Sequence, residues 1–131
     1  MKRFAIAGMV CAFTSFSGNV MAADMHQEFS TAITHAGMAA ASPDLNGVRM
    51  HMHHVMNCLA GPGGMGYDAA MADPCKGQGT GIIPDSAAAK RAGLEKTLAK
   101  ASAVSAATDY DVAKKQAADV QAELKQAASG M

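Results

Sequence analysis

The chain has no tryptophan and few other aromatic residues. Its 131 residues include four phenylalanines and two tyrosines. A b-type haem protein needs large apolar side chains to line a slot between helices, so this shortage argues against that class. The sequence also lacks a Cys-x-x-Cys-His motif, which excludes covalent c-type haem attachment.

The chain also lacks an excess of charge of either sign. Eleven basic residues balance eleven acidic ones, and no basic patch is present. Nucleic acid is therefore a poor candidate partner. The acidic residues are scattered singly, and no serine or cysteine lies in a recognisable nucleophile motif. We therefore expect the protein not to be an enzyme.

A single long apolar run is present, at the N-terminus. Lys2 and Arg3 precede an uncharged stretch from Phe4 to Phe16, and Val20-Met21-Ala22 has the small-residue pattern of a signal-peptidase site. The run is shorter than the ~20 apolar residues that span a bilayer. We expect residues 1–22 to be a signal peptide and the mature protein to be soluble, exported to the bacterial periplasm and free of the membrane.

Cysteine is scarce after this expected cleavage. Removing residues 1–22 from the 131 leaves 109, enough for one domain (residues 23–131), with a net charge near −2 and two cysteines, Cys58 and Cys75. In an oxidising compartment two cysteines form a disulfide more often than a pair of metal ligands. The bond would stabilise the fold by ~3 kcal/mol in the chain-entropy model. A thiolate ligand at Cys58 requires that this disulfide be absent.

The two halves of the chain align when shifted by 65 residues. Phe29 then falls on Leu94, and Val55 falls on Val120. Each copy has helical spacing of apolar residues, such as Phe29, Ile33, Ala36 and Ala40, interrupted by one tight turn. The pattern predicts an all-α four-helix bundle of two helical hairpins in an internal repeat, with helices over 24–41, 43–59, 86–107 and 109–129.

Turn residues separate these helices. Ser42 and Pro43 suit the start of the second helix, and Thr108 and Asp109 suit the start of the fourth. Hairpins 24–59 and 86–129 are joined by residues 60–85, which contain seven glycines and three prolines. This composition predicts a loop without long regular structure, held to the hairpin by Cys58–Cys75.

Histidine and methionine are concentrated in the first hairpin and the loop. Six of the seven residues from Met50 to Met56 are one or the other. All five histidines lie between Met25 and Met71, together with seven of the eight methionines expected in the mature protein. Imidazole and thioether are neutral, borderline-to-soft ligands that suit copper better than magnesium or calcium.

The helical positions divide these residues into filler and candidate ligands. Met52 and Met56 share the expected buried face and are predicted to fill the core. His51, His54 and Cys58 lie on one flank of that face, and His53 lies on the other. A hairpin turning near Pro43 places His35 level with His51. The candidate metal ligands are His35, His51, His54, Met50, Met38 and His53.

These ligands predict a site for copper, as Cu(I) or Cu(II), with zinc or nickel as alternatives. The function then expected is storage, buffering or tolerance of copper, with metal ions as partners. A periplasmic metal-transfer partner or a second copy of the chain is a further possible partner. The competing interpretation is a structural or interaction bundle that binds no metal.

The segment Thr34-His35-Ala36 and the histidines at 51–54 resemble the small metal-binding proteins of the bacterial periplasm. The resemblance covers about residues 25–59 and, more loosely, 90–127. It implies a four-helix bundle of repeated hairpins that binds several divalent metals, copper prominently. Two departures stand out: Lys100 and Ala117 replace His35 and Met52 in the second copy, and the loop between Cys58 and Cys75 is not part of that pattern.

Overall fold

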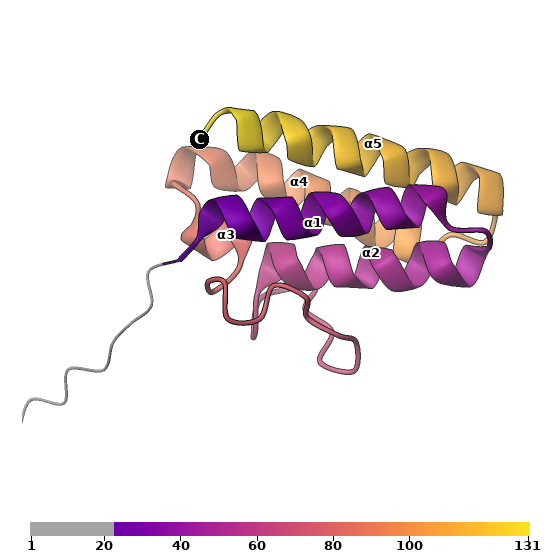
Figure 1. Ribbon diagram of the computed structural model, residues 1–131, viewed down its shortest axis with the longest axis horizontal. Coiled ribbons are helices and arrows are strands. Elements are labelled where there is room, and N and C mark those ends of the chain that lie inside the picture. The colour runs from indigo at the N-terminus through magenta and orange to yellow at the C-terminus, as the bar shows by residue number, and fades with distance from the viewer. Residues whose placement is uncertain (1–22) are drawn as a thin grey trace, which may run out of the picture.

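The computed structural model describes residues 23–131, so the expected signal peptide lies outside the described residues. The elements in this part are five helices, without a strand. They are α1 (Met25–Ala41), α2 (Leu45–Ala60), α3 (Ile82–Asp85), α4 (Ala88–Ser105) and α5 (Tyr110–Ser129) (Figure 1). The prediction of an all-α fold is confirmed. The short helix α3 lies within the segment predicted to be loop.

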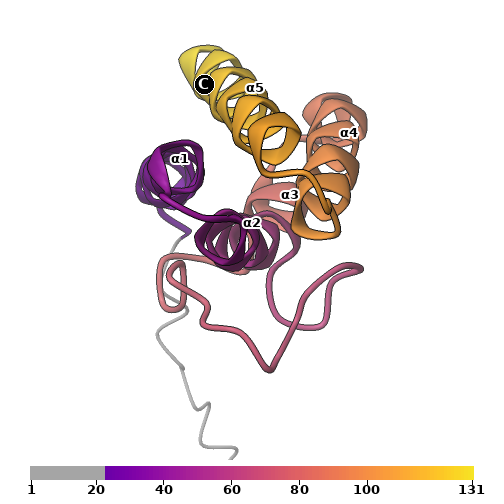
Figure 2. The same ribbon diagram turned by 90° about the vertical axis from the view of Figure 1, so that its right-hand side faces the viewer.

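The four long helices run side by side. Helix α1 packs against α2 and α5, while α4 packs against α2 and α5. The end-on view shows them surrounding a common centre, with α3 beside α2 and α4 (Figure 2). The glycine-rich segment before α3 runs along the outer side of α2. Helix α2 is therefore covered on two sides, by other helices and by this loop.

Aspartates begin three of the long helices. The Asp24, Asp44 and Asp109 side chains accept hydrogen bonds from the backbone N–H groups three residues ahead, at 2.8–3.0 Å. The predicted start of the second helix at Pro43 is wrong, because Asp44 is the N-cap and the helix begins at Leu45. Ser42 instead follows the end of α1, where its hydroxyl donates to the Met38 carbonyl at 2.8 Å.

The core uses a slightly rotated face of α1. The buried apolar residues of this helix are Phe29, Ala32, Ala36 and Ala39, whereas Ile33 and Ala40 are only half-buried. The reason is that α1 packs between two neighbours, α2 and α5, so its buried face points between them. On α2 the predicted core residues are buried as expected, including Met52 and Met56.

A disulfide and a close contact between its two ends hold the loop of residues 61–81 in place. The predicted disulfide joins Cys58 on α2 to Cys75 on the loop, with the Cα atoms 5.2 Å apart. The loop ends cross at Gly61 and Gly81. Gly61 has a φ of 67°, and a Cβ on it would lie 1.7 Å from the Thr80 carbonyl oxygen. Only glycine fits this crossing.

Asn57 fixes the middle of the loop. Its fully buried amide nitrogen donates to the carbonyls of Asp68, Met71 and Ala72 at 3.0–3.3 Å. Its side-chain oxygen accepts a hydrogen bond from the Asp68 N–H at 2.8 Å. One side chain thus satisfies several backbone groups that the loop cannot pair with itself.

Replacing Asn57 by alanine is expected to lower the free energy of unfolding by about 2–4 kcal/mol, because buried loop groups lose their partner. Urea denaturation would measure this loss, and faster hydrogen exchange at the Asp68 amide would locate it. The exposed Asn46 on the same helix offers the control, since Asn46→Ala removes an amide without a loop contact. Equal effects of both changes would contradict the role given to Asn57.

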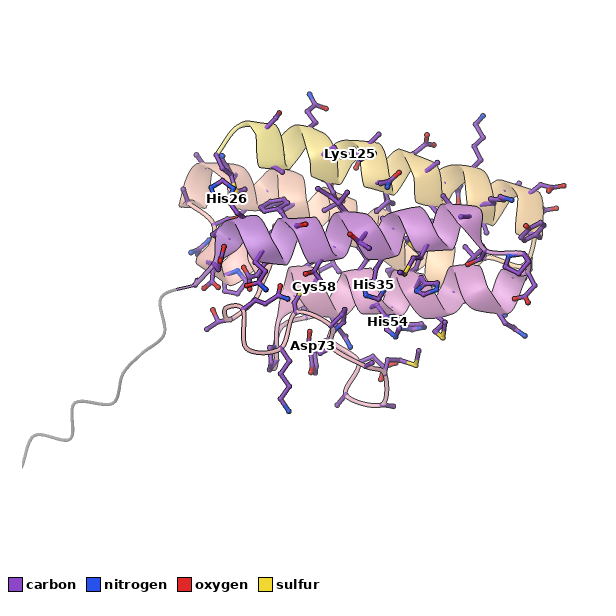
Figure 3. The ribbon with its side chains drawn as sticks, in the orientation of Figure 1. His26, His35, His54, Cys58, Asp73 and Lys125 are labelled. Atoms are coloured by element: carbon purple, nitrogen blue, oxygen red, sulfur yellow. A yellow bond between two sulfur atoms is a disulfide. The ribbon has the colours of Figure 1, made fainter. Side chains whose placement is uncertain are left out.

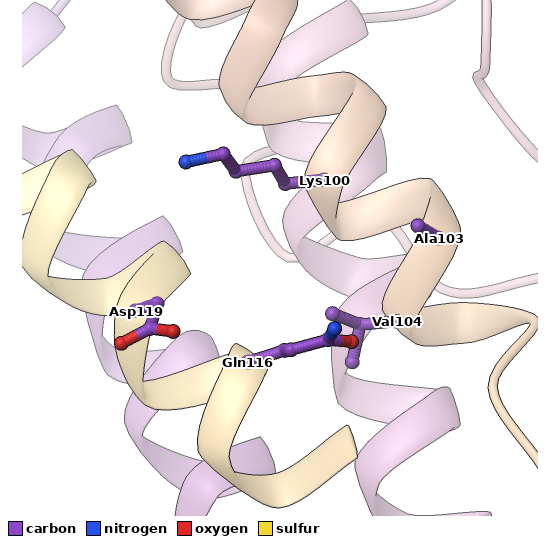
Figure 4. A pocket seen from close by; sticks show the side chains of 5 residues that line it. All are labelled: Lys100, Ala103, Val104, Gln116 and Asp119. Carbon is purple, nitrogen blue, oxygen red and sulfur yellow. The ribbon is translucent and has the colours of Figure 1, made fainter. Parts of the chain in front are cut away.

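A shallow hollow lies between α4 and α5. It measures about 210 Å³ and is lined by Lys100, Ala103, Val104, Gln116 and Asp119 (Figure 4). These side chains include neither histidine nor cysteine, so the hollow offers no imidazole or thiolate ligand.

Among the helices of residues 23–131, none combines the length and apolarity needed to cross a membrane.

Candidate metal site

Three of the predicted ligands converge between α1 and α2. His35 comes from the second half of α1, and His51 and His54 come from successive turns of α2. The labelled side chains of His35 and His54 lie next to one another in Figure 3, with Cys58 one turn further along α2. All three histidines are half-buried, so the group lies at the protein surface without being fully open to water.

The histidines face one another through the same ring atom. The Nδ1 atom of His35 lies 3.3 Å from that of His51 and 3.2 Å from that of His54. The rings of His35 and His54 meet edge to face, at 86°. The other two ring pairs, at 46° and 79°, do not stack face to face either, and one ligand atom from each ring lies within 4.8 Å of those of the other two.

The two Nδ1 separations from His35 match those around a bound ion. Nitrogen ligands lie about 2.0–2.1 Å from zinc, and tetrahedral geometry then separates two of them by about 3.3–3.4 Å. An ion among these atoms would take one imidazole nitrogen from each histidine. Without an ion, two Nδ1 atoms this close can form a hydrogen bond only if one of them carries a proton and the other does not. The donor set fits copper, zinc or nickel, all of which accept imidazole.

Burial favours the neutral form of the three imidazoles. It lowers the pKa of His35, His51 and His54 below the ordinary histidine value. Mutual repulsion adds to this effect, because His51 and His54 lower the pKa of His35 further. A metal ion binds the neutral imidazole, so these shifts favour metal binding at neutral pH.

The structure places His53 beside a carboxylate instead. Its Nδ1 atom lies 3.6 Å from an Asp68 carboxylate oxygen, on the loop side of α2. This placement agrees with the predicted opposite flank and separates His53 from the other three histidines. Met38 and Met50 lie on the same helices as the converging histidines, and both side chains are exposed.

A second group of potential ligand atoms belongs to Cys58, Asp73 and Cys75. These atoms lie within 4.8 Å of one another. The two sulfur atoms are bonded to each other, however, and a disulfide sulfur is not a thiolate. The group therefore holds the loop on α2 in this structure.

One buried charged residue was not predicted from the sequence. The Glu28 side chain in the first turn of α1 is completely buried, and its Oε1 accepts a hydrogen bond from the Gly81 N–H at 3.1 Å. Its Oε2 has no hydrogen-bond partner among the described residues. Burial raises its pKa to about 7, and the charges of Asp85, Asp73 and Asp24 add to this effect. The helical pattern gave no signal for it, because the covering segment is the distant loop.

Comparisons with known proteins gave no relative. No protein-family model matches the chain. Neither the curated proteins nor the solved structures contain a match.

Proposed function

We propose that this protein binds metal in the periplasm and serves in the storage, buffering or tolerance of copper. The observation that carries the proposal is the meeting of three Nδ1 atoms, from His35, His51 and His54, at distances that suit one ion. Copper is favoured over zinc and nickel because methionines flank the histidines on both helices. The role proposed is binding, without catalysis.

The architecture fits this proposal. We interpret the four long helices as a four-helix bundle of two repeated hairpins. Helices α2 and α5 begin at Leu45 and Tyr110, positions that the 65-residue shift superimposes. Only the first hairpin carries histidines, so we propose one metal-binding hairpin and one that completes the core.

The test is a copper titration of residues 23–131 against a competing chelator. His51→Ala/His54→Ala removes two of the three ligands and is expected to weaken copper binding by at least about 100-fold. Losing a residue that only supports a ligand lowers metal affinity by about 10- to 100-fold, so losing two ligands should cost at least as much. His53→Ala is the matched control, since it removes an imidazole from the same helix outside the converging group, and should change the affinity by less than about 3-fold.

Two results would contradict the proposal. Weak binding that survives the double substitution would favour the competing interpretation, a structural or interaction bundle. Equal losses in the double variant and in His53→Ala would place the site elsewhere on α2. Circular dichroism of each variant shows whether the helices remain folded.

A further inference from the structure

Two exposed methionines flank the histidine group. Met38 on α1 is 46% exposed, and Met50 on α2 is 42% exposed. Elsewhere on α2, Met52 and Met56 are buried in the core. Packing therefore explains the core pair but does not explain why two thioethers of the hairpin face water.

Helix geometry places both exposed methionines at one level. Helices α1 and α2 are antiparallel, and His35 meets both His51 and His54. Met38 lies three residues after His35, and Met50 lies four residues before His54. Both displacements run toward the turn between the helices, by about one helical turn.

The same geometry places each methionine beside a histidine. Residues three or four apart lie on one side of a helix, about 5–6 Å apart at Cβ. Met38 and His35 have this relation on α1, and Met50 and His54 have it on α2. The two thioethers thus border the histidine group from both helices, at its end nearest the turn.

Three imidazoles leave the fourth position of a tetrahedral ion open. We propose that the thioether of Met38 or Met50 occupies this position and makes the site selective for Cu(I). This inference rests on the proposed metal-binding function and adds the oxidation state of the ion. A thioether is a soft ligand that favours Cu(I), whereas Zn(II) gains little from it beside imidazole or water.

The experiment compares two metals in two variants. Cu(I) affinity is measured without oxygen, with ascorbate as reductant and a chromogenic Cu(I) chelator as competitor. Zn(II) affinity is measured with a zinc chelator. Met38→Leu/Met50→Leu keeps the apolar volume and removes both sulfurs, and is expected to lower Cu(I) affinity by about 10-fold or more while changing Zn(II) affinity by less than about 3-fold.

Met65→Leu is the matched control. Met65 is 90% exposed and lies in the loop, so its sulfur is an even more accessible thioether that belongs to neither α1 nor α2. We expect no change in affinity for either metal. X-ray absorption of the Cu(I) protein should show a sulfur neighbour that is absent from the double methionine variant.

Three outcomes would overturn the inference. Unchanged Cu(I) affinity in the double methionine variant would show that the thioethers are not ligands. Equal losses for Cu(I) and Zn(II) would give the methionines a general supporting role. In both cases the proposed function stands if His51→Ala/His54→Ala still weakens binding by at least about 100-fold. Absence of metal binding by the unaltered protein would overturn both proposals.

Discussion

Replacing Glu28 by glutamine is expected to raise the free energy of unfolding at pH 8 by up to about 3 kcal/mol. The folded protein raises the pKa of this carboxyl from 4.5 to about 7, and each pKa unit corresponds to about 1.4 kcal/mol. At pH 8 the folded chain must hold a buried negative charge near Asp85, Asp73 and Asp24. Glutamine has nearly the same shape and can accept the Gly81 hydrogen bond without that charge.

The direction of the pH effect follows from proton binding. Between pH 4.5 and about 7 the folded chain holds a proton at Glu28 that the unfolded chain has released. The contribution of Glu28 to stability is therefore complete below pH 4.5 and falls until the pH passes about 7. Glu28→Gln removes this dependence, so the stability difference between the two proteins should grow from pH 5 to pH 8.

Urea denaturation of both proteins at several pH values between 5 and 8 measures this difference. Comparing the two proteins matters because the histidines act in the opposite direction: their lowered pKa values cost stability as the pH falls below 6.5. Glu95→Gln, at an exposed position of α4, is the control for removing a carboxylate. A stability difference that stays constant over this range would contradict the assignment.

The second large effect concerns metal binding and pH. Metal affinity is expected to be nearly constant above pH 6.5 and to fall steeply in more acidic solution. Each histidine must be neutral to bind the ion. Where His35, His51 and His54 are all protonated, three protons must leave before the ion binds, so the affinity falls by at most about three factors of ten per pH unit. Because burial lowers the three pKa values, the steep fall should begin below the ordinary histidine value of 6.5.

Zinc serves as the probe here, because it does not change oxidation state. Competition titrations at pH 8, 7, 6 and 5 would give the slope. The His51→Ala/His54→Ala variant provides the comparison, since one remaining imidazole can give a limiting slope of only about one tenfold step per pH unit. A slope of about one in the unaltered protein would show that the three histidines do not bind the ion together.

Much of the helical structure was predictable because its signals are local. Apolar spacing and the turn near Pro43 predicted the hairpin, and with it the approach of His35 to His51 and His54. The burial of Met52 and the disulfide between Cys58 and Cys75 followed from spacing and composition. The start of the second helix was harder to predict, because Ser42, Pro43 and Asp44 all suit a helix terminus. In the structure Asp44 is the cap, since its side chain accepts a hydrogen bond from the Gly47 N–H.

The sequence by itself determined which residues share a helix face, because that depends only on the 3.6-residue period. The tertiary structure decided what covers each face. Asn57 lies on the outer flank of α2, yet the loop buries it completely and bonds it to four backbone groups. The same loop brings Asp68 to within 3.6 Å of His53 and buries Glu28. The path of residues 61–81 follows from contacts across long sequence distances, which no local pattern records.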